Sequence, residues 1–112
     1  MSYLIRRWLS VLMIAFAALC VHSANATTVM GVRSCGQWIA RKSTDVDKAA
    51  TEAWLLGYLS GLATGSRVDI LHDADYASLM AWMDNYCNAH PLERVSSGAA
   101  QLYLELQGRT PK

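Results

Sequence analysis

The sequence lacks an excess of charge of either sign, which limits the partners that the protein can bind. Its 112 residues carry ten lysine and arginine side chains against nine aspartate and glutamate side chains, a formal net charge of +1 with histidine neutral. No cluster of basic residues stands out along the chain. Because proteins that bind nucleic acid need clustered lysine and arginine to hold the phosphates, we expect no nucleic-acid partner.

Patterns typical of several enzyme classes are also missing from the sequence. No serine lies in a nucleophile elbow, and the glycines in the middle of the chain have helical spacing rather than the spacing of a phosphate-binding loop. No two cysteines have the C-x-x-C spacing of redox sites. We therefore predict a protein that is not an enzyme, with no catalytic residues, no cofactor and no metal site.

The first 26 residues have the three-part pattern of a secretory signal peptide. Arg6 and Arg7 form a positive segment, an apolar run follows over residues 8–21, and residues 24–26 read Ala-Asn-Ala, which matches the small-x-small rule of signal peptidase. The apolar run is shorter than the ~20 residues that cross a bilayer. We therefore predict cleavage after residue 26, no membrane anchor after processing, and a periplasmic or secreted protein.

The cysteines that remain after this cleavage predict one disulfide. Removal of the signal peptide takes Cys20 away and leaves Cys35 and Cys87. Each lies beside or inside a predicted helix, and exported proteins form disulfides readily. A Cys35–Cys87 bond should stabilise so small a domain by roughly 4 kcal/mol.

The middle of the chain is an uncharged stretch in which small residues recur at every fourth position. These residues are Ala53, Gly57, Gly61 and Gly65. Residues four apart share one face of a helix, so the stripe forms a shallow groove that another backbone can approach closely. Because each interior glycine costs a helix up to about 1 kcal/mol relative to alanine, we expect tertiary packing to fill this helix-packing groove and the helix to lie at the centre of the core.

The ends of this long helix have their own signals. Thr44, with Asp47 three residues later, resembles a capping box, so the helix should begin near Asp45. Gly65 suits the left-handed residue that closes many helices, so the helix should end there.

Apolar residues at intervals of three and four predict three further helices. The first is a short helix over residues 35–42, and the second begins after Asp73 or Asp75 and carries the second cysteine. The third starts in the first turn with Pro91, buries Leu92 and ends near residue 108. Its thin middle, residues 96–100, is the expected partner of the glycine groove.

The sequence contains no alternating strand pattern and no Asn-Gly turn, and the connectors are short. We therefore predict an all-α fold, a small single-domain bundle of about four helices with one disulfide. The expected organisation is a signal peptide over residues 1–26, a flexible arm over 27–34, the helical domain over 35–108 and a tail over 109–112.

The connector over residues 67–75 contains the densest polar cluster of the sequence. Asp69, His72, Asp73 and Asp75 place three carboxylates and an imidazole within seven residues. Such groups can bind divalent metals, but their spacing matches neither a calcium loop nor a helical histidine pair. We expect a solvated loop whose aspartates cap the next helix, and we identify Arg67, Asp69, His72 and Asp73 as a candidate surface for a protein partner.

Three short motifs give the chain a resemblance to a known family. They are S-C-G-Q-W-I at residues 34–39, W-L-L-G-Y-L-S-G at 54–61 and W-M-D-N-Y-C-N-A-H-P-L at 82–92. The chain resembles the HdeA/HdeB-like periplasmic proteins, with Cys87 and Pro91 at the places of their second cysteine and the proline that follows it. This resemblance implies a helical, acid-responsive chaperone with a single disulfide, which loosens at low pH and holds unfolding clients.

The G-Y-L-S-G and H-P-L pieces are also similar to the Tai-type immunity proteins. That similarity implies a periplasmic inhibitor that plugs a toxic cell-wall amidase, and it stands as the alternative function. In both cases the expected partners are other proteins, either a client or a toxin, and a homodimer is a further alternative.

Overall fold

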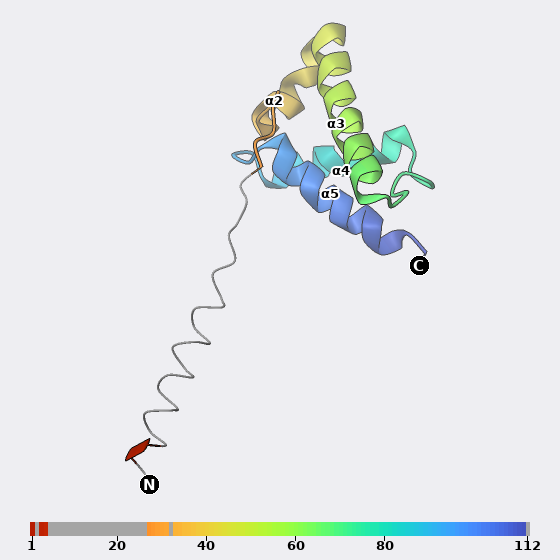
Figure 1. Cartoon of the computed structure of the whole chain (residues 1–112). Coiled ribbons are helices and arrows are strands. Elements are labelled where there is room, and N and C mark those ends of the chain that lie inside the picture. Colours follow the sequence, from red (N-terminus) through yellow and green to blue (C-terminus); the bar gives the residue numbers. More distant parts are fainter. Residues whose placement is uncertain (2, 5–26, 32, 112) are drawn as a thin grey trace.

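A computed structural model of the chain describes residues 1, 3–4, 27–31 and 33–111. Most of the predicted signal peptide and its cleavage site lie outside the described residues. Over residues 27–31 and 33–111 the order of elements is α2 (Cys35–Ala40), the 3₁₀ turn η1 (Arg41–Ser43), α3 (Asp45–Ser66), α4 (Tyr76–Ala89) and α5 (Val95–Arg109) (Figure 1). In this part of the chain the only β pairing is an isolated antiparallel bridge between Ser34 and Arg94. The all-α prediction is therefore confirmed.

Short polar side chains begin the first three of these helices. The side-chain oxygens of Ser34, Thr44 and Asp75 each accept a hydrogen bond from the backbone N–H three residues later, at 3.2, 3.1 and 2.9 Å. Such caps satisfy backbone donors that have no partner within the helix. The predicted start of α3 at Asp45 is confirmed, and Asp75 rather than Asp73 caps α4.

The predicted disulfide is present and joins α2 to α4. Cys35 and Cys87 are bonded, and both are fully buried. Helix α2 packs against α4, and α5 packs against both α4 and α3. The core lies between these helices and consists of Cys35, Trp38, Leu55, Leu59, Ile70, Leu79, Met80, Met83, Cys87, Val95, Ala99, Leu102 and Leu106. No helix in the described part of the chain is both long and apolar enough to cross a membrane.

The small-residue stripe of α3 does not face the core, which corrects the prediction. Ala53, Gly57, Gly61 and Gly65 are all exposed, and a Cβ atom added at any of the three glycines would meet no described atom within 4 Å apart from its chain neighbours and the backbone of its own helix. The opposite face of α3 is buried instead, through side chains such as Leu55 and Leu59. Burial free energy scales with apolar area, so the large aliphatic residues decide which face of the helix turns inward.

The close helix approach occurs at Gly98 of α5 instead. A Cβ atom at Gly98 would lie 2.6 Å from Cδ1 of Tyr86 and 2.8 Å from Cε of Met83, both on α4. The thin middle of α5 therefore packs against α4, and the prediction that it packs against the glycines of α3 is wrong.

The two glycine environments predict opposite effects of the same substitution. Gly57→Ala and Gly61→Ala should each raise the free energy of unfolding by up to about 1 kcal/mol, because alanine favours the helix and the added methyl group points to solvent. Gly98→Ala should lower it by about 1–3 kcal/mol, because Tyr86 and Met83 must move. Urea denaturation of the three variants tests this. Equal effects at Gly57 and Gly98 would show that the assigned faces of α3 and α5 are wrong.

Two helix ends also differ from the prediction. Helix α3 runs one residue beyond Gly65, and the left-handed residue is Arg67, with φ 58°. Helix α5 begins at Val95 rather than in the turn with Pro91, and Leu92 is 98% exposed rather than buried. The last helix also extends to Arg109, one residue past the predicted domain boundary.

The late start of α5 has a tertiary cause. The Cys35 backbone N–H donates to the Glu93 carbonyl at 2.8 Å, and the Val95 N–H donates to the Arg33 carbonyl at 2.9 Å. Both bonds need an extended backbone at Arg94, where φ is −95° and ψ is 149°, so the helix cannot begin earlier.

The same contacts show that the N-terminal arm is not loose where it joins the domain, against the prediction of a flexible segment over residues 27–34. Besides the Arg33 bond, the indole Nε1 of Trp54 donates to the Met30 carbonyl at 3.0 Å. Met30 thus ties the arm to α3, and Arg33 ties it to the start of α5.

Candidate functional site

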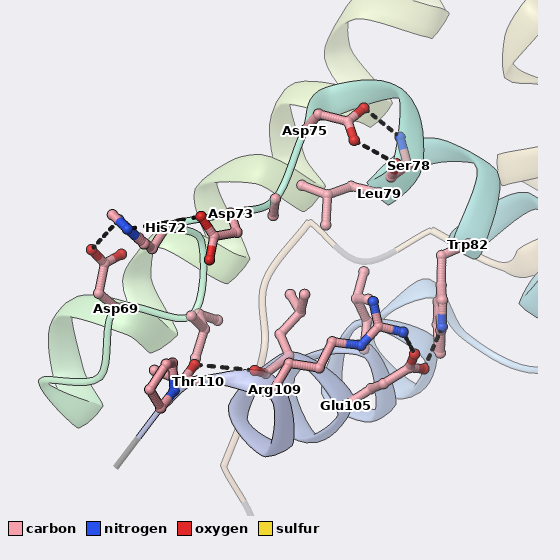
Figure 2. A pocket seen from close by; sticks show the side chains of 15 residues that line it. Asp69, His72, Asp73, Asp75, Ser78, Leu79, Trp82, Glu105, Arg109 and Thr110 are labelled. Carbon is pink, nitrogen blue, oxygen red and sulfur yellow. Dashed lines mark hydrogen bonds and ion pairs between the residues drawn. The ribbon is translucent and has the colours of Figure 1, made fainter.

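A cleft of about 490 Å³ opens between the connector, the first half of α4 and the second half of α5 (Figure 2). Most of the surface that lines it is apolar, and the buried side chains at its floor are Ile70, Leu79, Leu102 and Leu106, next to Trp82. Exposed polar side chains from the connector and from α5 form its rim. The cleft is the strongest candidate for a functional site in the described part of the chain.

Three of the four predicted partner-surface residues lie at this rim. His72 Nδ1 is 3.8 Å from Asp69 Oδ2, and His72 Nε2 is 3.8 Å from Asp73 Oδ1 (Figure 2). The side chains of Asp69 and His72 are each 74% exposed, and that of Asp73 is 88% exposed. Arg67 is exposed but does not line the cleft, so the structure brings together only the other three.

Asp75 lies at the same rim, and its carboxylate caps the N-terminus of α4. It accepts hydrogen bonds from the Ser78 hydroxyl at 2.5 Å and from the Ser78 backbone N–H at 2.9 Å. These bonds, that of the hydroxyl first, lower the pKa of Asp75 below its ordinary value. Both bonds make Asp75 the cap of helix α4.

The opposite wall of the cleft joins α4 to α5 through Glu105. Trp82 Nε1 donates to Glu105 Oε2 at 2.6 Å, and Arg109 pairs with the other carboxylate oxygen of Glu105 (Figure 2). Neither Glu105 nor Arg109 was predicted from the sequence as a site residue. The Glu105–Arg109 spacing of four is a helical ion-pair signal that could have been recognised, whereas nothing local indicates that the Trp82 indole reaches Glu105.

The rim carboxylates do not form a metal site in the residues that the structure describes. No group of three histidine, cysteine, aspartate or glutamate side chains there is placed to hold an ion. The polar atoms of Asp75 and Glu105 already serve structural hydrogen bonds, and the floor is apolar. This arrangement is suited to binding a ligand of mixed apolar and charged character.

A second polar cluster lies around Arg41, which is only 2% exposed. Arg41 Nε donates to Glu52 Oε1 at 3.0 Å, and Nη1 donates to Asp84 Oδ1 at 2.7 Å and to the Trp38 carbonyl at 3.0 Å. The guanidinium carbon also lies 4.1 Å from the centroid of the Trp38 ring. One cation therefore ties η1 to α2, α3 and α4.

Asp84 is the carboxylate of this cluster with the most donors. It accepts hydrogen bonds from Arg41, from Lys42 Nζ at 2.9 Å and from Trp38 Nε1 at 2.8 Å. Burial by itself raises the pKa of Asp84, but these three donors outweigh burial and hold the pKa below its ordinary value of 3.8. The stability of this region therefore depends on a charged Asp84.

Comparisons of the chain with family models, with curated proteins and with solved structures found no match. The resemblances to the HdeA/HdeB-like and Tai-type proteins thus stay predictions from the sequence motifs.

Proposed function

We propose that this chain is a non-enzymatic protein-binding domain that acts in the periplasm or outside the cell. The observation that carries the proposal is the cleft of about 490 Å³ with its apolar floor. Its volume lies in the range typical of ligand-binding clefts. A buried disulfide supports the location, because such bonds persist in oxidising compartments and are rare in the cytosol.

The candidate that follows from the main resemblance is an acid-responsive chaperone of the HdeA/HdeB kind. Asp84 supports it, because its folded-state pKa is lowered below 3.8. A carboxylate of this kind stabilises the fold fully above its unfolded-state pKa, and the contribution is lost as the pH falls through the lower folded value. Protonation of Asp84 as the pH falls through this lowered pKa should therefore weaken its bond to Arg41 and loosen α2 and η1 from the core.

A client-aggregation experiment tests the chaperone. We expect the purified protein to suppress light scattering by an aggregation-prone client at about pH 3 and to do so weakly at pH 7. Asp84→Asn, which mimics the protonated carboxyl, should move the onset of suppression to higher pH. Asp45→Asn, a change at an exposed carboxylate, is the matched control and should leave the onset unchanged. No suppression at either pH would exclude the chaperone.

The second candidate is an immunity or inhibitor protein with one dedicated enzyme partner. The covalent Cys35–Cys87 link and the buried Arg41 cluster favour it, since they hold the helices in one arrangement and a rigid surface loses little entropy on binding. The immobilised protein should retain one enzyme in equimolar amount from an envelope extract and should inhibit it after elution. Absence of a stoichiometric partner would contradict this candidate.

A further inference from the structure

We infer that the cleft binds a segment of a partner protein in which an aliphatic side chain stands next to a lysine or arginine. The inference rests on the proposed protein-binding function and adds the chemistry of the segment that is bound. It follows from the floor and the rim of the same cleft, because the floor favours an apolar group and the rim favours a positively charged one.

The floor requires an apolar group. Leu79 of α4, Leu102 and Leu106 of α5 and Ile70 of the connector all line the cleft and are buried. These four side chains are aliphatic and offer no hydrogen bond to a polar group, so a leucine, isoleucine or valine is the best occupant of the floor. Burial of an aliphatic side chain there also removes apolar floor atoms from water.

The rim requires a positive charge. Asp69, Asp73, Asp75 and Glu105 place four carboxylates around the opening, and the one arginine of the lining, Arg109, is already paired with Glu105. In the described residues the ion-pair partner of Asp69 and Asp73 is the His72 imidazole at 3.8 Å, which carries a charge only when protonated. A lysine or arginine beside the buried aliphatic side chain would meet this negative rim, whereas an acidic segment would be repelled.

Other occupants fit less well. A divalent cation would need three convergent ligands, and none are so placed in the described part of the chain. A second copy of this chain could offer its exposed turn, where Leu92 is 98% exposed and Arg94 is nearby, but Glu93 stands between them and would face the acidic rim. A segment of another protein is the occupant that the charges favour.

The test uses three hexapeptides blocked at both ends, followed by NMR and calorimetry. The first alternates leucine and lysine, the second replaces lysine with glutamate, and the third replaces leucine with serine. At pH 7 the first peptide should shift the indole N–H signal of Trp82, which is assigned by comparison with Trp82→Phe. We expect at least tenfold weaker binding of the other two peptides, because each lacks one of the two required groups.

Variants of the rim provide the second measurement. Asp69→Asn combined with Asp73→Asn should raise the Kd of the leucine–lysine peptide about three- to tenfold and reduce its dependence on salt. The matched control is Asp45→Asn combined with Glu93→Gln, which removes two exposed carboxylates outside the lining and should leave the Kd unchanged. Asp75 is left intact because it caps α4.

Several results would overturn the inference. They are equal binding of the lysine and glutamate peptides, a Trp82 signal that does not move, or a Kd that the rim pair leaves unchanged. A further result would assign the cleft to a second copy of this chain: self-association that moves the Trp82 signal, with both the association and the change in the signal abolished by Leu92→Ser. If none of the peptides binds while the protein still holds clients or retains an enzyme, the proposed protein-binding function is supported and the chemistry inferred for the cleft is wrong.

Discussion

Replacing Arg41 with methionine should lower the free energy of unfolding by about 3–5 kcal/mol, one of the two largest effects expected of a change in this domain. The guanidinium is 2% exposed and is paired with Glu52, which is 5% exposed, and with Asp84. Methionine preserves most of the side-chain volume and removes the charge. The cost arises because the buried Glu52 then loses its cation, and the partly buried Asp84 keeps only the exposed Lys42 as its cation.

The matched control is Lys42→Met. Lys42 pairs with the same Asp84 at 2.9 Å, but its side chain is 61% exposed. An exposed pair of this kind contributes about 0–1 kcal/mol, so the Lys42 variant should remain close to the parent in urea denaturation. If both variants lose the same stability, burial of the Arg41 cluster is not what makes it important.

The loss in free energy of unfolding caused by Arg41→Met should also be smaller at acid pH. As the pH falls below the lowered pKa of Asp84, the carboxyl gains a proton in the parent and the ion pair no longer contributes. Unfolding curves at pH 7 and at about pH 3 should therefore differ less between parent and variant at the lower pH. A difference independent of pH would indicate that lost packing, and not lost charge pairing, causes the destabilisation.

Removal of the disulfide is the second large effect. Cys35→Ala combined with Cys87→Ala should lower the free energy of unfolding by roughly 4 kcal/mol, because these two positions, separated by 52 in the sequence, are then free to move apart in the unfolded chain. Small domains have about 5–15 kcal/mol in total, so the double variant should be marginally stable.

Thermal and urea denaturation with and without reductant measure this effect. Reductant should lower the midpoint of the parent to that of the double alanine variant and should leave the variant unchanged. The measurement on the variant controls for any effect of the reductant other than reduction of the disulfide. A double variant with the stability of the oxidised parent would show that the disulfide does not hold α2 on α4.

Capping residues and the spacing of apolar residues were sufficient to predict where α3 and α4 begin and which face of α4 is buried. Thr44 and Asp75 offer oxygens where helices must begin, and both cap the backbone N–H three residues later. The intervals of three and four placed Leu79, Met83 and Cys87 on one buried face. These predictions succeeded because capping and helical periodicity depend on residues close in the sequence.

The candidate site was predicted only in part. Asp69, His72 and Asp73 were recognised as a polar surface, and they lie at the rim of the cleft. The rest of the floor and the far wall include Leu102, Glu105 and Leu106 of α5, which lies well beyond the connector in sequence, and no local pattern brings them together. The Arg41 cluster was missed for the same reason, since its carboxylates belong to two other helices.

By itself, the sequence determined the all-α class, three of the helix starts or caps, and the pairing of Cys35 with Cys87. Only the tertiary structure decided which face of α3 is buried and where α5 begins. Periodicity identifies two faces of α3, one small and one aliphatic, but the area that neighbouring helices can cover selects the aliphatic face. The start of α5 was likewise set by backbone hydrogen bonds to the distant Arg33 and Cys35, which hold Arg94 extended and override the local preference for a helix after proline.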